Sequence, residues 1–231
     1  MNDSELIESV LRGTIHPDIE FIDALNRRQS FSAKGLIAYP DVERAIMVAT
    51  FRHAKQKRKG SDTPYISHLL SVGELVAKYG TNRPHVWAAG ILHDIVEDTG
   101  YTLHALDAQF GIEVATLVSL VTEDMSLKDA DNESGTAKAT WQQRKDLYIE
   151  RIRHAKDDAV IICAADKLHN LETLGTDFVL HGPAIWSRFN ASPERLGWFY
   201  KSVTEVVSSR IDKEIAVRLS KCWDRLQPIF L

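Results

Sequence analysis

One short run in this chain combines residue types that bind divalent metal ions: His93-Asp94-Ile95-Val96-Glu97-Asp98. Its carboxylates repel one another and lose hydration on burial unless a cation offsets them. Burial is indicated by the apolar residues that precede the run, namely Val86, Ala88, Ala89, Ile91 and Leu92. Imidazole and carboxylate ligands suit Mn²⁺, Fe²⁺ or Zn²⁺. The run therefore predicts part of a metal site, with a solvated acidic helix end as the simpler alternative.

Further ligands must come from other segments, because two adjacent side chains do not hold a divalent ion tightly. His68 opens a second apolar segment and is one candidate, although a polar cap explains a histidine there more simply. Asp166 is the better candidate, because it follows the uninterrupted apolar residues 159–165, where an unpaired carboxylate is strongly unfavourable. The alternative for Asp166 is a salt bridge to Lys167 or Arg153.

A basic segment over residues 55–59 ends in Arg58 and Lys59. Paired cations suit a polyphosphate that carries several negative charges, although such runs are usually solvated surface. Asn170 lies four residues after Asp166 and therefore on the same face of a helix. Its amide could hydrogen-bond a phosphate, a sugar or a metal-bound water.

Helical periodicity predicts the elements that position these residues. Apolar side chains recur at i, i+3, i+4 and i+7 from Val42 to His53, and no strand–helix–strand alternation indicates a parallel sheet. The predicted helices cover about residues 40–53, 66–79, 84–98, 102–110, 112–122, 140–155, 157–174 and 194–227. Residues 128–139 are polar and aperiodic and are predicted to form a surface loop. The predicted fold class is all-α, with residues 1–40 as an N-terminal helical extension.

Composition limits the partners and the compartment. Lys plus Arg total 28 against 32 for Asp plus Glu, and this net charge of −4 argues against a nucleic-acid or membrane-surface binder. The apolar run 159–165 is far shorter than the roughly 20 residues of a membrane span, and nothing near the N-terminus resembles a signal peptide. Cys163 and Cys222 make no disulfide framework, which favours a reducing compartment. We therefore expect a cytoplasmic protein.

Several short motifs occur in a fixed order between residues 41 and 175. They are Arg58-Lys59, Thr63-Pro64-Tyr65-Ile66-Ser67-His68, the run from Leu92 to Thr99, Phe110-Gly111, Val121-Thr122, and Ala164-Ala165-Asp166-Lys167-Leu168-His169-Asn170-Leu171. In this order they resemble the hydrolase domain of the RelA/SpoT-type alarmone enzymes, a branch of the HD-domain phosphohydrolases. The resemblance implies a helical bundle of the HD type, with one hydrolase domain over residues 41–227. Since the remaining residues do not accommodate a synthetase domain, the chain resembles a small stand-alone alarmone hydrolase.

The resemblance also implies roles for individual residues. One Mn²⁺ per chain would be bound by His68, His93, Asp94 and Asp166. The acidic pair Glu97 and Asp98 matches the residues that polarise the attacking water. The positions that match nucleotide contacts are Arg58, Lys59, Asn170 and Thr173. The implied enzyme is a guanosine-3′,5′-bis(diphosphate) 3′-pyrophosphohydrolase, which converts ppGpp or pppGpp to GDP or GTP and pyrophosphate and so degrades the alarmones of the stringent response.

Two acids, Glu123 and Glu172, stand where the long bifunctional enzymes usually carry basic residues. They leave the substrate open, so ppApp and the 2′-phosphate of NADPH are alternatives to ppGpp. A general HD-domain nucleotidase is a second enzymatic alternative and needs only the four metal ligands. A non-catalytic HD scaffold is the non-enzymatic alternative, but such modules typically lack a ligand or the acidic pair. The expected partner is a small nucleotide, and whether the chain forms a homo-oligomer stays open.

Overall fold

The computed structural model describes residues 39–80, 82–124, 126–127 and 137–231. The predicted extension at residues 1–40 therefore lies almost entirely outside the described residues, as does most of the loop predicted at 128–139. Within the described residues the regular elements are helices, and the backbone pairs in β fashion only at an isolated antiparallel bridge between Lys57 and Pro64. The all-α prediction is confirmed.

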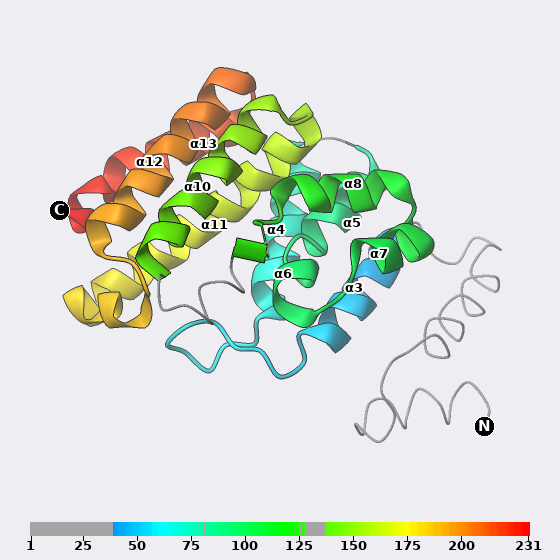
Figure 1. Ribbon diagram of the computed structural model, residues 1–231, viewed down its shortest axis with the longest axis horizontal. Coiled ribbons are helices and arrows are strands. Elements are labelled where there is room, and N and C mark those ends of the chain that lie inside the picture. The colour runs from blue at the N-terminus through cyan, green and yellow to red at the C-terminus, as the bar shows by residue number, and fades with distance from the viewer. Residues whose placement is uncertain (1–38, 81, 125, 128–136) are drawn as a thin grey trace.

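The helices follow one another along the chain as Figure 1 shows. They are α3 (Pro40–Arg52), α4 (Ile66–Tyr79), α5 (Pro84–Ile91), α6 (Ile95–Thr99), α7 (Leu103–Phe110), α8 (Ile112–Val121), α10 (Ala137–His154), α11 (Asp157–His181), the 3₁₀ helix η1 (Gly182–Arg188), α12 (Pro193–Arg210), α13 (Glu214–Leu226) and the 3₁₀ helix η2 (Gln227–Phe230). Local sequence explains several starts. Proline occupies the first turn of α3, α5 and α12, where its missing N–H costs nothing. The hydroxyl of Thr102 caps α7 by accepting from the backbone N–H of Ala105 at 3.1 Å.

The helix predicted over residues 84–98 is wrong in one respect, because the chain forms two helices there. Residues 92–94 form a turn between α5 and α6. On a continuous helix His93 and Asp94 would point about 100° apart. The turn instead brings the His93 imidazole within 3.0 Å of the Asp94 carboxylate. The interruption is therefore part of what builds the site.

Three other boundaries also differ from the prediction. α11 continues to His181 instead of ending at residue 174. Gly175 does not end the helix; it lets α13 pack closely, because a Cβ built on it would lie 2.8 Å from a methyl of Leu226. The segment predicted as one helix over 194–227 is α12 and α13, separated at residues 211–213. α10 begins at Ala137, inside the predicted loop. These boundaries depend on packing between helices that the local sequence does not reveal.

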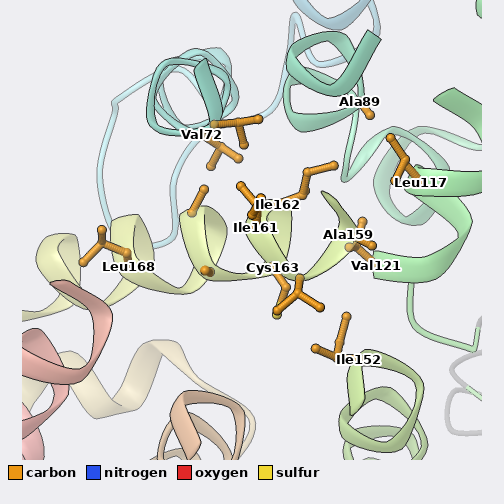
Figure 2. Packing of buried hydrophobic residues seen from close by; sticks show 14 of the residues in the cluster. Val72, Ala89, Leu117, Val121, Ile152, Ala159, Ile161, Ile162, Cys163 and Leu168 are labelled. Atoms are coloured by element: carbon orange, nitrogen blue, oxygen red, sulfur yellow. The ribbon is translucent and has the colours of Figure 1, made fainter. Parts of the chain in front are cut away.

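α11 is the central helix of the bundle. Its residues 159–165 are each at most 1% exposed. Figure 2 shows this helix surrounded by apolar side chains of α4, α5, α8 and α10, among them Val72, Ala89, Leu117 and Ile152. Because α11 is apolar on all sides over these turns, the next residue, Asp166, places its carboxylate inside the bundle.

Among the described residues, none of the helices is both long and apolar enough to cross a bilayer.

The burial of α11 predicts a large cost for removing its apolar side chains. Replacing Ile162, which is fully buried, with alanine leaves a cavity and should lower the free energy of unfolding by about 2–5 kcal/mol. Val179→Ala is the matched control on the same helix, because Val179 is 84% exposed and its loss should change stability by less than about 0.5 kcal/mol. Urea denaturation of the two variants measures the difference. Equal effects would contradict the central position of α11.

Candidate metal centre

The four predicted metal ligands converge from three regions of the chain. His68 lies in the first turn of α4, His93 and Asp94 lie in the turn before α6, and Asp166 lies midway along α11. Oδ2 of Asp94 is 3.0 Å from Nε2 of His93 and 3.7 Å from Nε2 of His68. Oδ1 of Asp166 is 3.3 Å from Nε2 of His68 and 3.6 Å from Nε2 of His93. The ligand atoms of His68, His93 and Asp94 all lie within 4.8 Å of one another.

The two imidazole rings direct their Nε2 atoms towards this centre. Nδ1 of His93 is 2.9 Å from the carbonyl oxygen of Gly90. A carbonyl only accepts, so Nδ1 carries a proton, and Nε2, which faces the carboxylates, is the nitrogen that would bind a metal. Nε2 of His68 and Nε2 of His93 are buried, and neither has a hydrogen-bond partner among the described residues. A divalent cation satisfies both lone pairs and offsets both carboxylates, so the donor set fits a metal ion.

His169 supports the orientation of His68. The Nδ1 atoms of these two rings are 2.8 Å apart, so one donates and the other accepts. Burial, His68 and Arg58 lower the pKa of His169 to about 4, and a neutral His169 is able to accept the proton of His68 Nδ1. That arrangement leaves Nε2 of His68 as the ligand atom. Burial likewise lowers the pKa of His68 and keeps the ring neutral.

Both carboxylates of the centre are ionised. Burial opposes their charge, but His93 outweighs it at Asp94 and lowers the pKa of that group. At Asp166 the cation of Lys167 and both histidines hold the pKa well below its usual value. The same carboxylates overcome the effect of burial on His93 and raise its pKa well above the usual value. Without a metal the centre therefore holds a proton on His93.

Asp166 is shared between the centre and its own helix. Its Oδ2 accepts from Nζ of Lys167 at 2.6 Å, while its Oδ1 faces the two histidines. The salt bridge to Lys167 that was the alternative to metal ligation is thus present beside the centre and uses the other oxygen. Arg153 pairs instead with Glu150, with 3.2 Å between Nε and Oε2.

The predicted nucleotide contacts are only partly brought together. Nη2 of Arg58 donates to Oδ1 of Asn170 at 2.9 Å, and Nδ2 of Asn170 donates to Oδ1 of Asp166 at 2.5 Å, so both residues border the centre. Lys59 is directed to Phe189, with Nζ 5.7 Å from the ring centroid. The hydroxyl of Thr173 donates to the carbonyl of His169 within α11 at 2.8 Å.

The acidic pair on α6 is oriented by two different segments. Oε1 of Glu97 accepts from the backbone N–H of Glu123 at 2.7 Å. Oδ2 of Asp98 accepts from Nε2 of Gln56 at 2.8 Å, and Oε1 of Gln56 is 2.6 Å from Nδ1 of His53. The two adjacent carboxylates are therefore held from the end of α8 and from the loop after α3.

Tyr65 is a site residue to which the sequence reasoning assigned no role. Its hydroxyl donates to Oδ2 of Asp94 at 2.6 Å, and the guanidinium carbon of Arg58 is 5.7 Å from its ring centroid. Burial and Asp94 raise its pKa, so it stays a donor. Its position in the sequence could have indicated a role, because Tyr65 immediately precedes the helix that carries His68. In the structure the backbone N–H of His68 donates to the carbonyl of Tyr65 at 2.9 Å.

Glu123 and Glu172, the two acids at positions where the long bifunctional enzymes usually carry basic residues, are each paired with cations. Glu123 contacts Lys145 and Arg144 of α10. Glu172 accepts from Nη2 of Arg218 at 2.7 Å. Both charges are therefore largely offset within the protein.

A model of the HD domain matches residues 45–198, which is most of the described bundle and includes all four predicted ligands. The chain belongs to the HD domain family. This match confirms the HD-domain part of the resemblance inferred from the motifs, and the relatives and the solved structure described next confirm its alarmone-hydrolase part. Family membership implies a divalent metal ion, and the group formed by His68, His93 and Asp94 is able to hold one.

Relatives of this HD-domain protein include two kinds of enzyme. A probable GTP pyrophosphokinase of Mycobacterium leprae is 38% identical over 165 residues, which is 71% of this chain but only 19% of that protein. The guanosine-3′,5′-bis(diphosphate) 3′-pyrophosphohydrolase MESH1 of Drosophila melanogaster is 31% identical over 157 residues, which is 66% of this chain and 79% of MESH1. A solved structure of a metazoan ortholog of SpoT, described as hydrolysing ppGpp and acting in starvation responses, is 26% identical with a TM-score of 0.63 and covers 80% of this chain and 94% of its own.

The raised pKa of His93 predicts that metal affinity increases with pH. A metal must displace the proton on this ring, so lowering the pH below the raised pKa weakens binding and raising the pH through it strengthens binding. Calorimetric titration of metal-free protein with Mn²⁺, in buffers of different ionisation enthalpy, measures both the affinity and the released proton. His104→Gln, at an exposed histidine of α7, is the control and should leave both unchanged. Binding that is independent of pH and releases no proton would contradict the assignment.

Proposed function

We propose that this HD-domain protein is a Mn²⁺-dependent guanosine-3′,5′-bis(diphosphate) 3′-pyrophosphohydrolase, which removes pyrophosphate from ppGpp or pppGpp to give GDP or GTP. The observation that carries the proposal is the pair of buried Nε2 atoms of His68 and His93, which face two carboxylates and have no hydrogen-bond partner among the described residues. Relatives of similar length carry this activity in their names, MESH1 of Drosophila melanogaster among them. The reaction belongs to the degradation of stringent-response alarmones.

The proposed ligands are His68, His93, Asp94 and Asp166, holding one Mn²⁺ per chain. Two imidazoles with two carboxylates form a mixed nitrogen and oxygen set that suits a borderline or hard divalent ion, Mn²⁺ among them. When bound, the ion supplies Lewis acidity and lowers the pKa of water from about 15.7 towards neutrality. Tyr65 then holds the Asp94 carboxylate in place through its 2.6 Å hydrogen bond.

Glu97 and Asp98 are proposed to orient the attacking water and accept its proton. A carboxylate acts as a general base when it is ionised and held within hydrogen-bond reach of the proton. The backbone N–H of Glu123 fixes Glu97, and the amide of Gln56 fixes Asp98.

Arg58, Asn170, Lys59 and Thr173 are proposed to bind the nucleotide. The guanidinium of Arg58 borders the centre and is planar, so it suits bidentate binding of phosphate oxygens. Asn170 offers an amide one helical turn from Asp166, and Thr173 follows on the same face of α11. With Glu123 and Glu172 each paired to cations, repulsion of a polyphosphate is reduced, which favours the 3′-pyrophosphate reading.

We assign the activity to residues 41–227 as one domain, with residues 1–40 as an extension. The thiols of Cys163 and Cys222 are both buried and free, which suits the reducing cytoplasm where nucleotides of this class are made and used.

The substrate is tested with a nucleotide panel. Purified protein with Mn²⁺ is incubated with ppGpp, ppApp, NADPH and dGTP, and all products are identified by chromatography. We expect pyrophosphate and a nucleoside diphosphate from ppGpp, with little turnover of dGTP, because a phosphate attached elsewhere lies out of line with the attacking oxygen. Preference for dGTP would replace the proposal with a general nucleotidase, and release of free phosphate from NADPH alone would retain the metal site but refute the 3′-pyrophosphate geometry. Turnover of ppApp in preference to ppGpp would show that the substrate carries adenine instead of guanine.

Two substitutions separate metal binding from proton transfer. Asp94→Ala removes a proposed ligand and should abolish both bound metal and turnover. Glu97→Gln should retain the metal but lower kcat by about 10²–10⁴-fold, which is the usual contribution of a positioned base. Asp107→Ala, an exposed acid of α7, is the control and should change neither. Elemental analysis and kinetics measure the two effects, and normal metal content in Asp94→Ala would refute its role as a ligand.

A further inference from the structure

A second group of buried charges lies outside the predicted metal site, between the end of α8 and α10. Nε of Arg144 is 3.3 Å from Oε2 of Glu123, and Nζ of Lys145 donates to Oε1 of the same carboxylate. The three side chains are only 11–15% exposed. Burial alone would raise the pKa of Glu123, but Lys145, Lys167 and Arg144 outweigh it, so Glu123 is ionised.

Stability alone is a weak explanation for such a group. The free energy lost when these charged side chains leave water offsets most of the attraction between them. Well-packed apolar residues of similar volume often stabilise a core equally well. The structure nevertheless surrounds Lys145 with aromatic rings: its Nζ is 4.3 Å from the ring centroid of Phe199 and 5.8 Å from that of Trp141. These contacts hold the cation in one place. A geometric role is the more direct explanation.

The same region of α10 also holds the backbone at the end of α8. Arg151 donates to the carbonyl of Thr122 and lies 3.5 Å from the carbonyl of Ser119. A cation at this position complements the negative end of the helix dipole. Thr122 is the C-cap of α8 and has extended backbone, so the N–H of the next residue, Glu123, leaves the helix.

Glu123 therefore makes contacts in two directions. Its side chain is fixed by Lys145 and Arg144, and its backbone N–H donates to Oε1 of Glu97 at 2.7 Å. We propose that the Glu123–Lys145 pair positions the Glu97 carboxylate, so that Glu123 is a positioning residue that acts through its backbone amide. The kinetic consequence rests on the proposed function, whereas the structural coupling does not. Displacing a reacting group by about 1 Å can cost about 10²-fold in rate.

Amide hydrogen exchange tests the coupling without any substrate. In Lys145→Met the Glu123 N–H should exchange about tenfold faster than in the wild type, and Glu97→Ala, which removes the acceptor, should have the same effect. Lys145→Arg keeps the cation and should restore slow exchange. Lys201→Met is the matched control, because Lys201 pairs with Glu205 at 3.9 Å on the surface of α12. Exchange is followed residue by residue by NMR, with the Val118 N–H of α8 as the internal reference.

The exchange outcomes are decisive in either direction. Faster exchange at Glu123 with an unchanged rate at Val118 supports the proposal. Unchanged exchange at Glu123 overturns it, because the ion pair then does not hold the Glu123 N–H against Glu97. Equal acceleration at Val118 also overturns it, because the pair then affects only the stability of α8.

Kinetics test the consequence for the reaction. Glu123→Gln should lower kcat for ppGpp by about tenfold or more, while KM and bound metal stay within about twofold. In a Glu97→Gln background the same substitution should have no further effect, because the group that it positions no longer accepts a proton. Glu150→Gln is the control, since Glu150 contacts Arg153 and His154 on the exposed side of α10.

Equal losses of kcat in both backgrounds would overturn the positioning role while leaving the proposed function intact. A wild type that releases no pyrophosphate from ppGpp would refute the proposed function, and the exchange measurements would still decide whether the Glu123–Lys145 pair holds Glu97.

Discussion

Asp166 places a negative charge inside a helical bundle, and that charge constrains how the surrounding helices pack. The residue is 6% exposed and follows an apolar turn of α11 that meets other helices on every side. An unpaired carboxylate there would cost at least several kcal/mol, so each of its oxygens needs a cationic or hydrogen-bonding neighbour. Lys167 supplies one from the same helix, and the histidines of α4 and of the turn before α6 face the other. The position of these three elements is thus tied to one buried charge.

Much of this arrangement could be predicted from sequence because the decisive signals are local. The adjacent His93 and Asp94 and the acidic pair behind them lie within one short run, and Asp166 ends an apolar stretch that already implies burial. Helical periodicity likewise identified most elements, since an amphipathic face repeats within each helix. That the four ligands come together at one site was predicted from the family resemblance of motifs in a fixed order, and no single segment predicts it.

The remainder depends on contacts between distant residues. The turn that splits α5 from α6 has no glycine or proline at residues 92–94 to announce it. The hydrogen bond from Tyr65 to Asp94 joins two segments that show no periodic relation. Glu123 is a further example. As an acidic residue it argued against a polyphosphate substrate, but in the structure its carboxylate is paired with Lys145 and Arg144 of α10. Side-chain partners of this kind exist only after the helices have docked.

The wide spacing of the ligand residues along the chain has a consequence for synthesis and folding. His68 and His93 are made early, but Asp166 is added much later, after α8, all of α10 and the first two turns of α11. Bringing these segments together costs loop-closure entropy, and contacts between residues far apart in the sequence slow folding. A nascent chain carries the histidines without the buried carboxylate that completes their environment. A chain that has not docked α11 therefore contains both histidines and Asp94, but it lacks the buried carboxylate of Asp166 that faces them in the folded protein.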